Sequence, residues 1–173
     1  MTDLFKMLGK FEQQGNKPPV ESWNPEVEGE IDILIDKRGD WYHEGGYFER
    51  QDLARMFSSI LRVINGNYYL VTPAEKLRIK VEDVPFLVVL MDYQSDCIRF
   101  ITSLGDEVVA DKEHPIEFRA NGAGEQVPYV HIRNGLWARL KQSVYYELAE
   151  FMEETPDGYA IRSGGEVFTV PQS

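Results

Sequence analysis

The feature that most constrains this chain is an internal repeat with a spacing of 91 residues. Residues 53–79 and residues 144–170 each pass from an amphipathic helical pattern into a pair of alternating strand patterns. The matched positions are polar and aromatic as well as apolar: Tyr68 with Tyr159, Thr72 with Ser163, and Glu75 with Glu166. Self-similarity at a fixed spacing is typical of repeated structural units, although two unrelated helix–hairpin units can also align by chance. We therefore predict two similar units.

The first copy contains an insertion that the second copy lacks. Trp41 matches Trp137 at an offset of 96, so five additional residues lie between Trp41 and its helix, in the neighbourhood of HEGGY at 43–47. If the duplication is real, each Trp lies on a strand just before its helix and packs in the core or between the repeats. The two hairpins, 68–81 and 159–170, should then superpose once the helices are matched.

Alternation of apolar and polar residues predicts that most of the chain is β-structure. Ile31, Ile33 and Ile35 alternate in one strand, and the turn sequence KRGD leads to a second strand at 41–43. Further strands are predicted at 68–71, 77–81, 86–92, 97–102, 107–110, 116–119, 129–132, 137–140, 159–162 and 167–170. The expected fold class is α+β, with two similar strands–helix–hairpin units and mostly antiparallel sheets.

Two amphipathic helices are predicted inside the repeat. In the first, the apolar residues recur at i, i+3, i+4, i+7 and i+8: Leu53, Met56, Phe57, Ile60 and Leu61. In the second, the matching positions run from Val144 to Met152. The acid-rich EFMEETPDG at 150–158 is interpreted as the solvated end of that helix.

These elements divide the chain into three segments. Residues 1–21 are predicted to form an N-terminal helix and linker, residues 22–82 an α+β domain, and residues 83–173 a β-rich domain with one long helix. The N-terminal helix is predicted from apolar residues at helical spacing: Leu4, Phe5, Leu8 and Phe11. The domain boundary is expected near residues 82–85.

Composition and charge narrow the classes of protein. The formal net charge of −11 disfavours binding to duplex nucleic acid, which needs a dense Lys/Arg surface, but allows a small anion to be held by a local basic cluster. A single cysteine, Cys97, excludes an internal disulfide framework and fits a reducing cytosol. The longest apolar run, Val84–Met91, is too short to cross a membrane, and the N-terminus lacks a signal-peptide pattern. We expect a soluble, cytoplasmic protein.

His43 and Glu44 are the first candidates for chemistry. They could act as a general acid–base pair or as two metal ligands, with Arg50 as an electrostatic partner. On a strand, however, adjacent side chains point to opposite faces, so the two converge only if the turn at Gly45 and Gly46 folds them together. A histidine that only precedes a turn is the alternative, and we predict no catalytic residue, no metal and no cofactor.

The segment VTPAEKLRIKV at 71–81 concentrates positive charge in an acidic chain. Thr72 begins a turn, and in the strand that follows Lys76, Arg78 and Lys80 share one face. We call these three cations the basic ridge. The second copy replaces them with Val167, Thr169 and Pro171. The basic ridge either binds an anionic group or protects an edge strand against aggregation.

Several strings in the first half resemble a bacterial family catalogued as domain of unknown function number twelve eighty-five. They are SWNP at 22–25, GDWYHEG at 39–45, ERQDLARMFSSIL at 49–61 and, above all, YYLVTPAEKLRIKVEDVPFL at 68–87. The resemblance covers residues 19–87 closely and the remainder in outline. Tyr47 departs from it, because the family pattern is expected to place a proline there.

The resemblance implies a duplicated two-domain α+β protein whose second half is loosely similar to pleckstrin-homology-like barrels. It also implies a ligand site at the domain interface, for a nucleotide-like molecule in signalling, and it assigns no catalytic residue. Trp23, in the linker before Asn24 and Pro25, either pins the entry segment to the body of the domain or lines a groove.

We therefore expect a non-catalytic ligand-binding or signalling module that holds a small anionic or nucleotide-like ligand between its domains. The candidate ligand-binding residues are Trp23, His43, Glu44, Arg50, Thr72, Lys76 and Arg78. An enzyme that uses His43 and Glu44 is one alternative, and a protein-binding adaptor that uses the N-terminal segment is another. Assembly into a homo-oligomer is left open.

Overall fold

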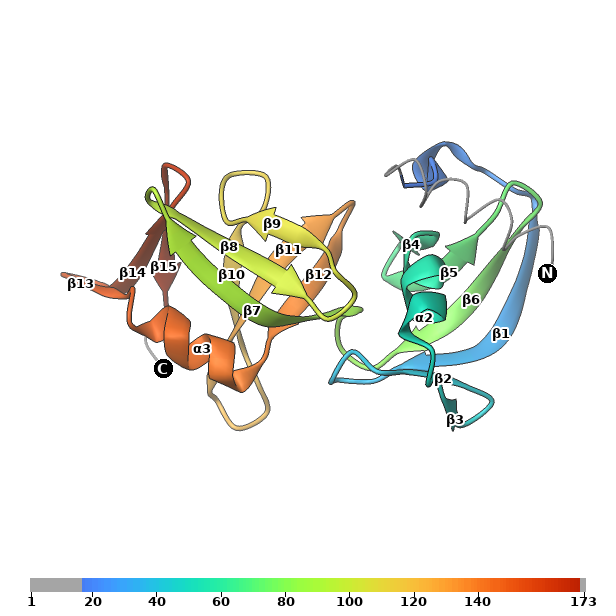
Figure 1. Cartoon of the computed structure of the whole chain (residues 1–173), viewed down its shortest axis with the longest axis horizontal. Coiled ribbons are helices and arrows are strands. Elements are labelled where there is room, and N and C mark those ends of the chain that lie inside the picture. The colour runs from blue at the N-terminus through green and yellow to red at the C-terminus, as the bar shows by residue number, and fades with distance from the viewer. Residues whose placement is uncertain (1–16, 172–173) are drawn as a thin grey trace. The chain divides into compact units, whose positions relative to one another are not determined.

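The chain divides into two units, residues 1–83 and residues 84–173, and the computed structural model describes residues 17–171. Both units are built mainly from strands (Figure 1). The expected α+β organisation, with two units and mostly antiparallel sheets, is confirmed. The N-terminal helix predicted around residues 4–11 lies outside the described residues.

The first unit is one six-stranded sheet with a short α-helix (Figure 1). The strands lie in the order β3-β2-β1-β6-β5-β4, and all neighbouring pairs are antiparallel except β1 and β6, which are parallel. Its elements are η1 (Val20–Ser22), β1 (Val27–Ile35), β2 (Trp41–His43), β3 (Gly46–Tyr47), α2 (Gln51–Ser58), β4 (Leu61–Ile64), β5 (Asn67–Val71) and β6 (Glu75–Val81). The parallel pair places β6 inside the sheet, between β1 and β5.

Alternating apolar side chains of β1 form the centre of the first unit's core. Ile33 and Ile35 are only 2% and 0% exposed. Trp41, on the paired strand β2, is also buried, and its ring stacks on Phe57 of α2 with the centroids 6.5 Å apart. Phe48 packs edge-on against Phe57. Each fully buried side chain of this size contributes roughly 1.5–3 kcal/mol through removal of apolar surface from water.

The first helix is shorter than the apolar stripe predicted. We expected it to continue through Leu61, but it ends at Ser58. The hydroxyls of Ser58 and Ser59 donate to backbone carbonyls three residues back, at 2.7 and 2.5 Å, and such bonds compete with helix continuation. Leu61 then begins β4 and pairs with Leu70, so it is buried as part of a strand rather than a helix.

The second unit combines a six-stranded sheet with a separate three-stranded sheet (Figure 1). The larger sheet, in the order β10-β11-β12-β7-β8-β9, is antiparallel except for β7 and β12, and it curls as a half-barrel with α3 against β7. The elements are β7 (Phe86–Gln94), β8 (Cys97–Thr102), β9 (Glu107–Val109), β10 (Ile116–Ala120), β11 (Gln126–Arg133), β12 (Leu136–Leu140), α3 (Gln142–Ala149), β13 (Glu153–Thr155), β14 (Gly158–Ser163) and β15 (Glu166–Val170).

Two expectations for the second helix are wrong. The helix is not long, because it ends at Ala149, and the acidic segment after it is not a helix end but contains strand β13. Glu153 and Glu154 pair with β14 at the border of the three-stranded sheet, where charged side chains suit an exposed strand. No helix within residues 17–171 is long and apolar enough to cross a membrane.

The repeat in the sequence is also a repeat in the structure. The series α2, β4, β5, β6 recurs as α3, β13, β14, β15, and the helices coincide at the same spacing, residues 51–58 with 142–149. The hairpins pair in the same register, since Tyr69 faces Arg78 in one and Ala160 faces Thr169 in the other. The surroundings differ, because β6 has β1 as a second neighbour, whereas β15 pairs only with β14 in the described part of the chain.

Candidate functional site

A groove of about 600 Å³ opens between β1 and β6 in the first unit. The pairing of these strands is regular up to Glu30, which faces Arg78, and it resumes where Leu34 faces Lys80. Between those two pairs β1 has three residues and β6 has only Ile79. Inserted residues have no partner on the opposite strand, so they interrupt the hydrogen-bonded ladder and distort the strands locally. The groove lies at this interruption.

Four charged side chains line this groove. Glu30 and Arg78 are opposite partners, so their side chains leave the sheet on the same face. Because side chains alternate along a strand, Asp32 and Lys80 project from that face as well. The other lining residues come from the same unit: Ile31, Ile33, Gly66, Asn67, Tyr68, Ile79 and Val81.

The first cation of the basic ridge is paired within the protein. The Nζ atom of Lys76 lies 3.8 Å from the Glu28 carboxylate and 5.2 Å from the centre of the Tyr69 ring. Burial of Tyr69, together with its hydrogen bond to Glu28, raises the pKa of that phenol. Lys76 therefore completes a contact across β1, β5 and β6 and does not line the groove.

The charged side chains that line the groove have fewer partners within the protein than Lys76 has. Arg78 donates a hydrogen bond of 2.7 Å to the side-chain oxygen of Asn67. Within residues 17–171, the side chains of Lys80, Glu30 and Asp32 have no ion-pair or hydrogen-bond partner. The four side chains are exposed, so those without a partner are accessible to a ligand in the groove.

Protection of an edge strand does not explain the basic ridge. Lysines protect a sheet edge because they obstruct the approach of another strand to unpaired backbone groups. Strand β6 has β1 on one side and β5 on the other, and the outermost strands of this sheet are β3 and β4. The edge-protection alternative is therefore wrong.

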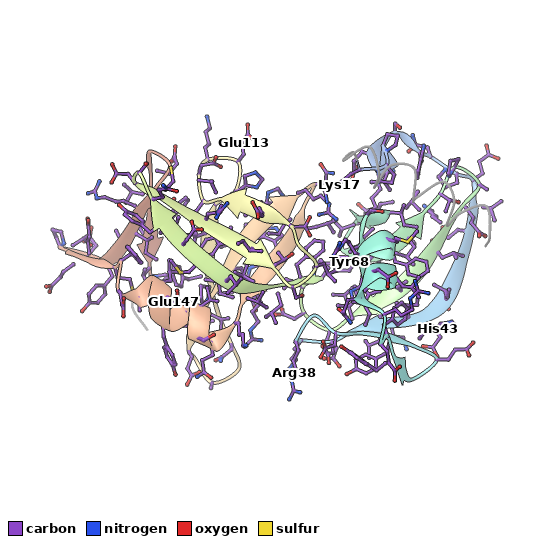
Figure 2. All side chains as sticks on the ribbon, in the orientation of Figure 1. Lys17, Arg38, His43, Tyr68, Glu113 and Glu147 are labelled. Atoms are coloured by element: carbon purple, nitrogen blue, oxygen red, sulfur yellow. The ribbon has the colours of Figure 1, made fainter. Side chains whose placement is uncertain are left out.

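A second groove, of about 480 Å³, lies between β1, the β2–β3 turn and the start of α2. Apolar side chains form most of it, and His43 and Arg50 are among its lining residues: Ile31, Ile33, His43, Gly46, Tyr47, Phe48, Glu49, Arg50, Leu53 and Phe57. Figure 2 shows His43 at the β2–β3 end of the unit, well apart from Tyr68, which lines the first groove.

The β2–β3 turn brings Glu44 back toward His43. Glu44 and Gly45 have φ angles of 50° and 82°, in the left-handed region that reverses the chain. The Nε2 atom of His43 nevertheless lies 3.9 Å from Glu44 Oε1, beyond hydrogen-bond distance, and the two side chains are 49% and 77% exposed. The pair is a solvated surface contact. No group of three His, Cys, Asp or Glu side chains in the described part of the chain is arranged to hold a metal ion.

Arg50 is held by Asp52 at the beginning of α2. Its Nε and Nη2 atoms donate to the two carboxylate oxygens at 3.2 and 2.6 Å. This bidentate pairing lowers the pKa of Asp52 and raises the pKa of Arg50. Asp52 also lies in the first helical turn, where the helix dipole favours a negative charge. Arg50 therefore stabilises the start of the helix.

Thr72 serves the turn between β5 and β6. Its hydroxyl oxygen accepts the backbone N–H groups of Ala74 and Glu75 at 3.2 and 3.1 Å. This geometry confirms the predicted turn, and it uses the Thr72 side chain locally.

Trp23 pins the entry segment to the sheet. It packs against a buried cluster of Val20, Tyr69 and Val71. Its carbonyl oxygen accepts a hydrogen bond of 2.9 Å from Arg62 on β4. Of the two roles considered for Trp23, the structure shows the pinning role.

The seven residues predicted from the sequence do not form one site. Arg78 lines the first groove, His43 and Arg50 line the second, and the others line neither: Trp23, Glu44, Thr72 and Lys76. Sequence reasoning missed Glu30 and Asp32. Their alternation along β1 was visible, but only the parallel pairing with β6 gives it meaning.

Both units match models of one protein family. Residues 18–84 match the N-terminal domain of DUF1285, described as a domain of unknown function, and residues 85–170 match its C-terminal domain. A DUF1285 family protein from Silicibacter pomeroyi DSS-3 is 36% identical, with a TM-score of 0.85 over 90% of this chain and 87% of that chain. A second, from Shewanella baltica OS155, is 29% identical, with a TM-score of 0.56 over 68% of this chain and 90% of that chain.

A comparison with curated proteins returned no match. The two family models together span residues 18–170 without an internal gap, and the Silicibacter structure shares the fold over most of both chains. The protein therefore belongs to the DUF1285 family.

Proposed function

We propose that the first unit is a non-catalytic ligand-binding module for signalling in the cytoplasm, and that it holds a small ligand by an anionic group in the groove between β1 and β6. Arg78 and Lys80 are the contacts for that group. The observation that carries the proposal is the place of these cations: they line a groove from an interior strand, where edge protection has no purpose.

Both cations have hydrogen-bonding capacity left for a ligand. A guanidinium group has five N–H donors, and Arg78 uses one hydrogen bond on Asn67. Lys80 has no partner in the described residues. A charge-assisted hydrogen bond contributes roughly 1.5–3 kcal/mol when shielded from water, and less at exposed positions such as these. Affinities in the micromolar to millimolar range, about −8 to −4 kcal/mol, are therefore expected.

Thermal-shift measurements on the full chain test the proposal directly. The ligands are inorganic phosphate, small carboxylates and nucleotides, each compared with a neutral analogue. We expect the anion that stabilises most to lose its effect in Arg78→Ala and in Lys80→Ala. Lys112→Ala, which removes an exposed lysine from the second unit, is the matched control and should respond like the parent protein. Unchanged stabilisation in Arg78→Ala would overturn the proposal.

The second groove supports one rival function, because His43 lies beside a space that an apolar substrate group could occupy. An acid–base role for His43 and Glu44 predicts turnover of a stabilising ligand and its loss in His43→Ala. A protein-binding adaptor predicts no response to any small molecule. Stabilisation by an anion without turnover, sensitive to Arg78→Ala and insensitive to His43→Ala, separates the binding module from both.

A further inference from the structure

The groove between β1 and β6 contains acids as well as bases. Glu30 and Asp32 project from β1 to the same face as Arg78 and Lys80 from β6. The formal charges of these four side chains therefore sum to zero. A ligand that carries only negative charge would gain from the two cations but would be repelled by the two carboxylates.

These opposite charges do not form ion pairs with one another. At the regular pair Glu28 and Lys76 the two side chains form an ion pair, with Lys76 Nζ 3.8 Å from the Glu28 carboxylate. At the next regular pair on the same face, Glu30 does not form an ion pair with Arg78, and in the interrupted section Asp32 forms none with Lys80 or with any other residue within 17–171. The same strands thus carry an ion pair beside a groove in which Glu30, Asp32 and Lys80 have no partner among the described residues and Arg78 has only Asn67.

We propose that the ligand of this groove is zwitterionic, with an ammonium group and an acid group on one small molecule, as in an amino acid. The acid group lies at Arg78 and Lys80, and the ammonium group lies at Glu30 and Asp32. This inference rests on the proposed function and narrows its ligand class. Such a molecule bridges the open section of the sheet as Lys76 and Glu28 bridge the regular section.

A set of probes that differ only in charge can test the inference. One set is 6-aminohexanoate, hexanoate and hexylammonium, and a shorter set is 4-aminobutanoate, butanoate and butylammonium. Binding to the full chain is followed through the backbone amide NMR signals of residues 30–33 and 78–81, which border the groove. We expect at least one zwitterion to bind about fivefold or more tightly than both its matched acid and its matched amine.

Substitutions in the groove test which side chains bind the acid group of the probe and which bind its ammonium group. Glu30→Gln with Asp32→Asn should lower the affinity for the zwitterion about fivefold or more without weakening the matched acid. Arg78→Gln should weaken both the zwitterion and the acid. Lys112→Gln is the control for a change of one positive charge elsewhere, and thermal midpoints of all variants verify that they are folded.

The outcomes separate this inference from the proposed function. If the acid binds as tightly as the zwitterion, and Arg78→Gln weakens it, the zwitterion inference is overturned and the anion-binding function stands. If the amine binds and the acid does not, the zwitterion inference and the anion-binding function are both overturned. A response confined to amides outside the groove, or no response to any probe, also overturns the inference, while the phosphate and nucleotide measurements still judge the function separately.

Discussion

Two adjacent glycines at the β14–β15 turn allow a stability prediction with an internal control. Gly164 and Gly165 both have left-handed φ angles, of 59° and 81°. A Cβ atom on Gly164 would lie 2.7 Å from the carbonyl oxygen of Ala110 and 2.8 Å from Asp111 Cβ, whereas a Cβ on Gly165 would meet nothing within 4 Å. Alanine at either position has left-handed backbone strain, but only at Gly164 does it also collide with backbone.

The expected losses of stability follow from the left-handed backbone strain and from the collision. Left-handed backbone costs an alanine about 1–2 kcal/mol, offset by about 0.4–1 kcal/mol because alanine restricts the unfolded chain more than glycine does. Gly165→Ala should therefore destabilise by roughly 0–1.6 kcal/mol. The collision at Gly164 requires a backbone shift, which adds about 1–3 kcal/mol. Gly164→Ala should then destabilise by roughly 1–4.6 kcal/mol, about 1–3 kcal/mol more than Gly165→Ala.

The collision matters because this turn joins the three-stranded sheet to the larger sheet of the second unit. The Gly164 N–H donates to the carbonyl of Asp96, and the neighbouring Ser163 hydroxyl donates to the carbonyl of Ala110. Urea unfolding followed by far-UV circular dichroism measures both variants, with an unchanged m value as the check on the comparison. If the two variants differ by less than about 0.5 kcal/mol, the close approach at Gly164 is not a constraint and the reasoning fails.

Three further predictions concern packing, a buried hydroxyl and pH. Phe57 and Leu148 are 7% and 0% exposed, so Phe57→Ala and Leu148→Ala should each cost about 2–5 kcal/mol in urea unfolding, and a loss below about 1 kcal/mol would contradict the packing. Ser163→Ala leaves the Ile98 N–H and the Ala110 carbonyl without their partner, so it should cost about 1–3 kcal/mol, measured in the same way. Pairing with Arg50 lowers the pKa of Asp52. The stabilising effect of this ion pair is therefore fully present above the ordinary carboxyl pKa of 3.8, and it is lost as pH falls through the lower pKa of Asp52 in the folded protein. The thermal midpoints of the parent and Asp52→Asn should therefore converge at low pH, and a constant difference would refute this.

Local patterns in the sequence predicted the kinds of element well. The alternation of Ile31, Ile33 and Ile35 identified β1, and the strand expected at 41–43 has the same bounds as β2. The turn at Thr72 was also correct, because the bonds that form it join residues only two or three positions apart. Elements whose stabilising contacts join residues close in the chain can therefore be predicted from the sequence.

The repeat could be predicted for the same reason, although its surroundings could not. The spacing of 91 residues predicts α3, β14 and β15 from α2, β5 and β6, because apolar and polar residues alternate in the same way in both copies. Helix length, by contrast, was wrong in both copies. Apolar spacing at Ile60 and Leu61 fits a helix or a strand, and the pairing of Leu61 with Leu70 selects the strand.

The groove was determined by tertiary structure alone. The sequence contains the acids of β1 and the bases of β6, and it places each set on one face of its strand. It does not show that these strands are neighbours, because Glu30 and Arg78 are far apart in the chain and pair only in the parallel section of the sheet. Nor does it show the three residues of β1 that stand opposite Ile79. Parallel pairing is nonlocal, and its register depends on how Ile33, Ile35 and Ile79 are buried together. The sequence therefore determines which charged residues β1 and β6 carry, whereas the tertiary structure determines that these residues lie together in one groove.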